Sequence, residues 1–154
     1  MTTLKITEIE GIGPAYAEKL ESAGVKNSDH LLDTGKTPKG RKNLAEKTGI
    51  SSKLILEWVN LCDLIRIKGV GEEYSDLLEE AGVDTVVELS NRNAENLQKK
   101  MLEVNNKKNL VKRTPRLNEV ESWISQAKNL PRKVEYSTKT ELTSMETYPD
   151  LEDK

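Results

Sequence analysis

A short glycine-rich motif occurs twice in this 154-residue chain, and it constrains the fold more than any other feature. Residues 9–14 read Ile-Glu-Gly-Ile-Gly-Pro, and residues 67–72 read Ile-Lys-Gly-Val-Gly-Glu, 58 positions later. Because glycine adopts conformations that a Cβ atom forbids, Gly-apolar-Gly between helical patterns predicts a tight turn with a buried apolar residue. We name these the first glycine turn (Gly11–Gly13) and the second glycine turn (Gly69–Gly71). Each is expected to open a helix whose free N–H groups can hold a phosphate.

The similarity of the two regions continues beyond the turns. Residues 9–25 and 67–83 are identical at nine of their seventeen positions, which predicts an internal duplication. In each copy a tyrosine, Tyr16 or Tyr74, stands four positions before a leucine, and this spacing places both side chains on one helical face. Each of these helices is expected to end at an Ala-Gly-Val sequence, whose glycine suits the C-terminal cap.

The rest of each copy reads as further helices. In the first copy the Thr-Pro pair at 37–38 predicts a helix start, and an apolar face that includes Trp58 predicts a later helix. In the second copy the Thr-Pro pair at 114–115 is expected to open the helix that carries Trp123. The tryptophans are 65 residues apart and the turns 58 apart, so the second copy holds seven extra residues. We expect the polar stretch 105–109 to hold them as a surface connection.

These patterns divide the chain into three parts. We predict one unit over residues 1–62 and a second over residues 63–130, with no flexible linker between them. A unit of about 60 residues is marginally stable alone, so the two are expected to share apolar surface and pack as one body. Residues 131–154 begin at a proline, are polar and acidic, and lack helical periodicity, which predicts a disordered tail.

Charge and composition exclude several classes of protein. The chain has 24 Lys and Arg against 26 Asp and Glu, and a net charge of −2 is unusual for a strong nonspecific nucleic-acid binder. No apolar run approaches the roughly 20 residues that span a bilayer, and residues 1–5 lack the pattern of a signal peptide. The single cysteine, Cys62, excludes an internal disulfide, and we expect a cytoplasmic protein.

No residue pattern predicts catalysis or a bound cofactor. His30 is the only histidine, and it has no partner at the spacing of a metal site or a catalytic pair. The second glycine turn is not a nucleotide loop, since it lacks the preceding strand and the lysine of such loops. We therefore expect a non-enzymatic protein with no metal, cofactor, small-molecule substrate or membrane partner.

The sequence Gly-Ile-Gly-Pro-Ala-Tyr at 11–16 and the later Thr-Gly-Ile-Ser at 48–51 resemble a helix-hairpin-helix unit. Such units are similar to the N-terminal domains of recombinases and to the C-terminal domain of the RNA polymerase alpha subunit. The whole tandem resembles an uncharacterised bacterial family of duplicated helix-hairpin-helix proteins. The residues that add to this resemblance are Trp58, the Arg-Thr-Pro sequence at 113–115 and the Trp-Ile pair at 123–124. The resemblance implies an all-α tandem of two five-helix, SAM-like units.

In DNA-binding members of the wider group, backbone amides of the hairpin contact a phosphate with help from a nearby lysine or arginine. Carried onto this chain, the resemblance implies Gly11, Ile12 and Gly13 as the contacts, with Lys19 as the nearest lysine. Two basic clusters further along could follow a sugar–phosphate backbone without reading its sequence. The predicted nucleic-acid-binding residues from these clusters are Lys36, Lys39, Arg41, Lys42, Lys107, Lys108, Lys112 and Arg113.

Carboxylates surround the second glycine turn and oppose a phosphate there. Glu72 and Glu73 follow it directly, and Asp76, Glu79 and Glu80 lie on the same predicted helix. Carboxylates in a first helical turn interact favourably with the helix dipole, yet they repel a phosphate. We therefore interpret the second glycine turn as structural.

Two functions remain open from the sequence. One is weak, sequence-independent binding of the DNA backbone by the first glycine turn together with the basic cluster at 36–47. The other is a protein-interaction adaptor, in which both turns only hold the fold and a surface of the tandem receives a partner. The acidic second turn and the charged tail favour the adaptor.

Overall fold

A computed structural model describes residues 3–136, and the regular secondary structure of this part is helical, with one isolated backbone bridge between Lys5 and Asn27. A short 3-10 turn, η1 (Ile6–Glu8), comes first. The helices of the first half are α1 (Pro14–Ser22), α2 (Ser28–Gly35), α3 (Pro38–Thr48) and α4 (Ser52–Leu64). Those of the second half are α5 (Glu72–Glu80), α6 (Val86–Ser90), α7 (Ala94–Lys108) and α8 (Leu117–Asn129). The predicted all-α class is confirmed, with four α-helices per half among the described residues rather than five.

Two helix boundaries in the second half differ from the predictions. The stretch 105–108 forms the last turn of α7 instead of a surface connection, and Asn109 ends that helix in the left-handed region at φ 52°. Helix α8 begins two residues after the Thr-Pro pair, because the Glu119 carboxylate accepts the N–H of Arg116 and so fixes Arg116 as the N-cap. The extra residues of the second half therefore lengthen both α7 and the connection that follows it.

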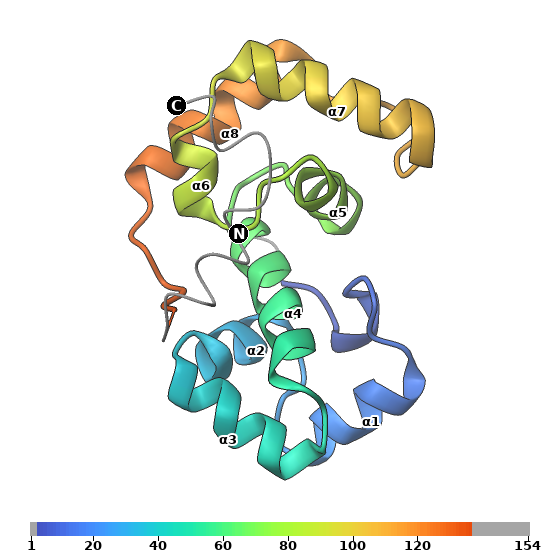
Figure 1. Cartoon of the computed structure of the whole chain (residues 1–154), viewed down its shortest axis with the longest axis vertical. Helices are drawn as coiled ribbons and strands as arrows, with labels where there is room; N and C mark the ends of the chain where they lie inside the picture. Colours follow the sequence, from blue (N-terminus) through green and yellow to red (C-terminus); the bar gives the residue numbers. More distant parts are fainter. Residues whose placement is uncertain (1–2, 137–154) are drawn as a thin grey trace.

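The helices form two lobes stacked along the long axis of the molecule, and α4 rises from the lower lobe into the junction (Figure 1). Most buried apolar residues from Ile6 to Cys62 belong to one core cluster, and those from Leu64 to Ala127 belong to a second. Direct packing between the lobes includes the contact of α4 with α5. The division into units of 1–62 and 63–130 stays a prediction about how each part folds.

The two glycine turns have closely similar geometry. Gly11 and Gly69 have φ angles of 90° and 98°, in the left-handed region that favours glycine. A Cβ atom on Gly11 would lie 3.1 Å from Nε1 of Trp58, and one on Gly69 would lie 3.0 Å from Nε1 of Trp123. Each turn thus needs glycine for two reasons, its backbone angle and the close approach of a tryptophan ring.

Each tryptophan also packs against the tyrosine of its own half. The ring centroids of Tyr16 and Trp58 are 5.3 Å apart, and those of Tyr74 and Trp123 are 5.2 Å apart. Both pairs are inclined, at 60° and 53°, as favourable edge-to-face aromatic contacts are. The recurring tyrosines and tryptophans therefore connect the helix after each turn to the last helix of the same half.

Residues 131–136 return from α8 to the lower lobe as an extended segment (Figure 1). Val134 is buried in the first core cluster, and the N–H of Glu135 donates to the carbonyl oxygen of Lys36 at 2.8 Å. The sequence prediction assigned these six residues to the tail, but burial of one valine and backbone pairing hold them on the folded body. The rest of the predicted tail, 137–154, lies outside the described residues.

Cys62 lies in the first core cluster, near the junction of the lobes. Burial, followed by the charge of the neighbouring Asp63, raises the pKa of its thiol, so the thiol stays protonated at neutral pH. Among residues 3–136, no helix combines the length and the apolar composition needed to cross a membrane. The cytoplasmic location stays a prediction.

Candidate functional site

The first glycine turn presents an open helix N-terminus. Gly13 is the N-cap of α1, it is exposed, and no carboxylate lies in the first turn of that helix. Gly11 is exposed as well. Ile12, however, is buried, and its N–H donates to the carbonyl oxygen of Ile9 at 3.1 Å. Ile12 is therefore an anchor for the turn, and its amide, which the resemblance assigns to a phosphate, is used within the turn itself.

Arg41 is also removed from the predicted phosphate contacts. It is 1% exposed, and its guanidinium donates to the carbonyl oxygens of Gly35 at 2.8 Å and Glu135 at 2.7 Å. A side chain held in this way stabilises the fold and cannot reach a nucleic acid. A signal for its burial was present in the sequence, since Arg41 shares a helical face with Leu44 and Thr48, which are both buried.

Three other predicted cations are paired with carboxylates. Lys36 contacts Asp33 at 3.2 Å, and Lys108 pairs with Glu80. Arg113 makes two contacts with Glu119, at 2.8 and 3.0 Å, and these hydrogen bonds lower the pKa of Glu119 to about 2. A phosphate would have to compete with these carboxylates. The remaining predicted cations, all exposed, are Lys19, Lys39, Lys42, Lys107 and Lys112.

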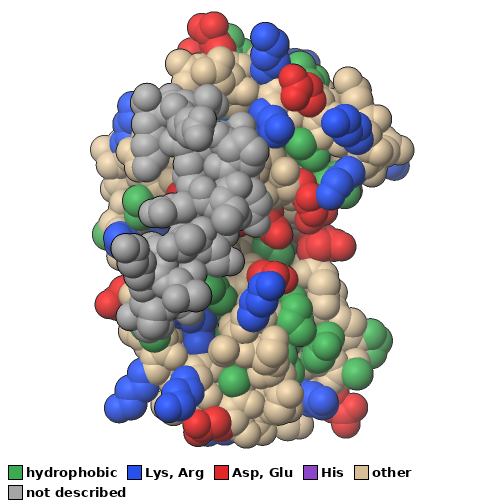
Figure 2. All heavy atoms as spheres, viewed as in Figure 1, with side chains coloured by type: hydrophobic (Ala, Val, Ile, Leu, Met, Phe, Trp, Pro, Cys, Tyr) green, Lys and Arg blue, Asp and Glu red, His purple; other side chains and the backbone are tan. Residues whose placement is uncertain are grey.

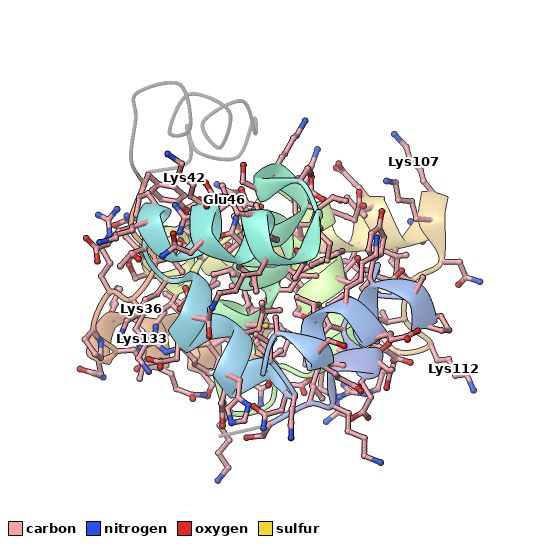
Figure 3. The ribbon with its side chains drawn as sticks, turned by 90° about the horizontal axis from the view of Figure 1, so that it is seen from below. Lys36, Lys42, Glu46, Lys107, Lys112 and Lys133 are labelled. Atoms are coloured by element: carbon pink, nitrogen blue, oxygen red, sulfur yellow. The ribbon has the colours of Figure 1, made fainter. Side chains whose placement is uncertain are left out.

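The two basic clusters do not form one surface. Figure 3 shows Lys36 and Lys42 on one side of the molecule and Lys107 and Lys112 on the opposite side. The first cluster lies in the lower lobe, on α3 and just before it, and the second lies in the upper lobe, at the end of α7 and just after it (Figure 1). The predicted residues therefore do not assemble into a continuous nucleic-acid interface.

The structure instead brings carboxylates together at the junction of the lobes. They come from the first turn region, from α4 and from α5, and Figure 2 shows acidic side chains along this waist. We name this set the acidic waist surface. Its members are Glu10, Glu57, Glu72, Asp76, Glu79 and Glu80.

Three carboxylates of α5 in the acidic waist surface hold protons unusually well. Burial, and then the charges of Glu10 and Glu80, raises the pKa of Asp76 to about 6. Burial, and then the charges of Glu80 and Asp76, raises the pKa of Glu79 to about 7. The pKa of Glu72 is raised by burial and by Glu10. Mutual repulsion across the waist thus adds to the cost of desolvation.

Sequence reasoning identified the carboxylates of α5 but missed the acidic waist surface. Glu10 lies 62 positions before Glu72, and only the folding of the first glycine turn against α5 brings their charges close. A cation beside this group is Lys108, whose charge lowers the pKa of Asp76 while it pairs with Glu80.

The described residues contain no group of three or more His, Cys, Asp or Glu arranged to hold a metal ion. A hollow of about 10 Å³ beside the waist has room for about one water molecule, far less than the several hundred Å³ of a small-molecule site. Its lining residues are Leu4, Ile9, Glu10, Leu61, Cys62, Ile65 and Ser75.

Comparison with known proteins gives one finding. The sequence profile of a family described as Domain of unknown function (DUF4332) matches residues 10–130. No curated protein and no solved structure matches the chain.

Proposed function

Since the chain belongs to the family Domain of unknown function (DUF4332), we propose its function from its surface chemistry. We propose a non-enzymatic interaction module that receives a positively charged segment of a partner protein on the acidic waist surface. The single observation that carries this proposal is the gathering of six carboxylates from three parts of the chain, of which Glu80 is paired with Lys108.

A cationic partner relieves a cost that the folded chain otherwise bears. At neutral pH, repulsion and burial act together on Asp76 and Glu79. A lysine or arginine brought close to them favours the charged carboxylates, and complementary charge also speeds the encounter of the two proteins. A phosphate backbone has the opposite effect at the same place. The proposal is therefore the adaptor hypothesis with the chemistry of its partner specified.

We further infer that the two halves are duplicated helix-hairpin-helix units. Support comes from the paired φ angles of Gly11 and Gly69 and from the two tryptophans that approach those glycines. The likeness to recombinase and polymerase domains and a bacterial origin remain predictions.

The proposed interaction is tested with a fluorescent lysine- and arginine-rich peptide titrated by anisotropy at low salt. The triple variant Glu72→Gln, Asp76→Asn, Glu79→Gln is expected to bind about tenfold more weakly, because three surface pairs of about 0.5 kcal/mol each are lost. At pH 8, above the pKa values of Asp76 and Glu79, the matched control Glu95→Gln, Glu103→Gln, Glu121→Gln removes the same charge from exposed positions elsewhere. An equal loss in both variants would show that overall charge, and not the waist, attracts the peptide.

Weak DNA-backbone binding is a second candidate, favoured by the open N-terminus of α1. A labelled duplex at about 50 mM salt is expected to bind with a Kd in the micromolar range, and the affinity should fall as salt rises. Gly13→Glu places a carboxylate at this N-terminus and is expected to abolish binding, while Gly71→Glu at the second glycine turn leaves it unchanged. Circular dichroism of both variants controls for unfolding. Absence of binding at micromolar protein excludes this candidate.

A further inference from the structure

We infer that residues 131–136 form a clasp that holds the two lobes in one orientation. The segment leaves α8 in the upper lobe and ends against the lower lobe, so it crosses the junction a second time after α4 (Figure 1). Two buried arginines, one on each side of the junction, donate hydrogen bonds to its backbone.

Arg66 holds the upper end of the clasp. Its Nη2 donates to the carbonyl oxygen of Pro131 at 2.8 Å, and its Nη1 contacts Oδ1 of Asp63 at 2.6 Å. The other carboxylate oxygen of Asp63 accepts the N–H of Val86, the first residue of α6, at 2.8 Å. The end of α4, the start of α6 and the clasp therefore share one buried polar network. Such a network is rigid because each lost partner leaves a buried polar group unsatisfied.

Arg41 holds the lower end. Its guanidinium donates to the carbonyl oxygen of Glu135, and the N–H of Glu135 donates to the carbonyl oxygen of Lys36. Both backbone groups of Glu135 are therefore bonded to the lower lobe. Val134 supplies the apolar anchor at 3% exposure. Tyr136 packs against the same core, and Arg132 lies over its ring at 5.8 Å.

The clasp has this effect because the lobes do not share a core. Helix α4 contributes residues up to Cys62 to the first core cluster, whereas its last residue, Leu64, belongs to the second. Helix α4 is therefore a single rod between two separately packed lobes. Helix α5 contacts α4 and lies near the first glycine turn on one side of the junction, and residues 131–136 cross it on the other side (Figure 1). Contacts on one side alone leave bending about the junction open, whereas a crossing on the opposite side restricts it. The inference does not depend on the proposed partner of the waist.

The test measures the distance between the lobes in the full-length chain. Spin labels are placed at Lys42→Cys and Lys107→Cys, which lie in different lobes, on a Cys62→Ala background, and their distance distribution is recorded by pulsed electron resonance. Val134→Asp removes the anchor and is expected to broaden the distribution and shift its mean. Lys133→Asp introduces the same side chain at the neighbouring exposed position and is expected to leave the distribution unchanged.

Val134→Ala guards against a variant that only unfolds the lower lobe. It shrinks the anchor without burying a charge, and it should broaden the distribution to a smaller extent while the helical circular dichroism is preserved. An unchanged distribution in both Val134 variants overturns the clasp. Equal broadening in Lys133→Asp also overturns it, because the effect would then come from charge on the segment and not from its anchor.

Discussion

At the scale of single residues, the two glycines of the first glycine turn differ in whether their positions require glycine. Gly11→Ala is expected to destabilise the chain by about 1–3 kcal/mol, because its φ of 90° strains any Cβ and the new atom would approach the Trp58 ring at 3.1 Å. Gly13 has an ordinary φ of −85° and open space around it. Gly13→Ser is expected to keep or raise stability, since serine is a good N-cap.

Urea unfolding of the two variants beside the parent chain checks this prediction. The change in midpoint, with an unchanged slope, gives the difference in stability. Equal stability of Gly11→Ala and the parent would mean that the turn relaxes away from the left-handed conformation without cost.

The same scale shows what a sequence can reveal about a site. The Gly-apolar-Gly pattern is enough to predict that Ile12 is buried. The resemblance assigns the Ile12 amide to a phosphate, but this amide bonds to the carbonyl oxygen of Ile9, and no residue pattern indicates that bond. Arg41 was grouped with its basic neighbours because charge counts ignore helical phase, although its spacing to Leu44 placed it on the buried face.

At the scale of elements, α5 makes stability depend on pH. In the folded chain the pKa of Asp76 is about 6 against an ordinary 3.8, and that of Glu79 is about 7 against 4.5. The folded state therefore binds these protons more tightly than the unfolded state, and stability is lost as pH rises from about 4 through 7. The melting temperature is expected to be higher at pH 5 than at pH 8.

Asp76→Asn with Glu79→Gln should flatten this dependence, because neither replacement titrates. Thermal unfolding followed by circular dichroism at pH 5, 6, 7 and 8 measures it in the parent and the double variant. The same slope in both would place the titrating groups elsewhere.

Helix types and most starts were predictable because capping residues and apolar spacing are local. Thr37 and Asn93 cap α3 and α7 through side-chain bonds, as their sequence context indicates. The end of α7 was less predictable, since three asparagines and two lysines look like a loop, while Lys107 and Lys108 in fact stabilise the helix C-terminus.

At the scale of the whole molecule, the features that were missed are those made by contacts between distant parts. The acidic waist surface needs the first glycine turn to lie near α5, and the segment 131–136 needs one valine to find the lower core. A lone Val134 in a polar stretch carries no periodic signal. These contacts also decide how charge is distributed, which the net charge of −2 conceals.

That distribution predicts how salt acts on the folded molecule. At pH 8, above the pKa values of Asp76 and Glu79, these two carboxylates are charged and repel their neighbours at the waist. Added salt screens this repulsion, since the screening length falls from about 30 Å at 0.01 M to about 10 Å at 0.1 M. Salt also weakens the exposed pairs Lys36–Asp33 and Arg113–Glu119, but pairs of this kind contribute only about 0–1 kcal/mol each. Raising sodium chloride over this range is therefore expected to raise the melting temperature. Asp76→Asn with Glu79→Gln should remove most of the rise, and a parent chain that loses stability with salt would show that the ion pairs outweigh the repulsion at the waist.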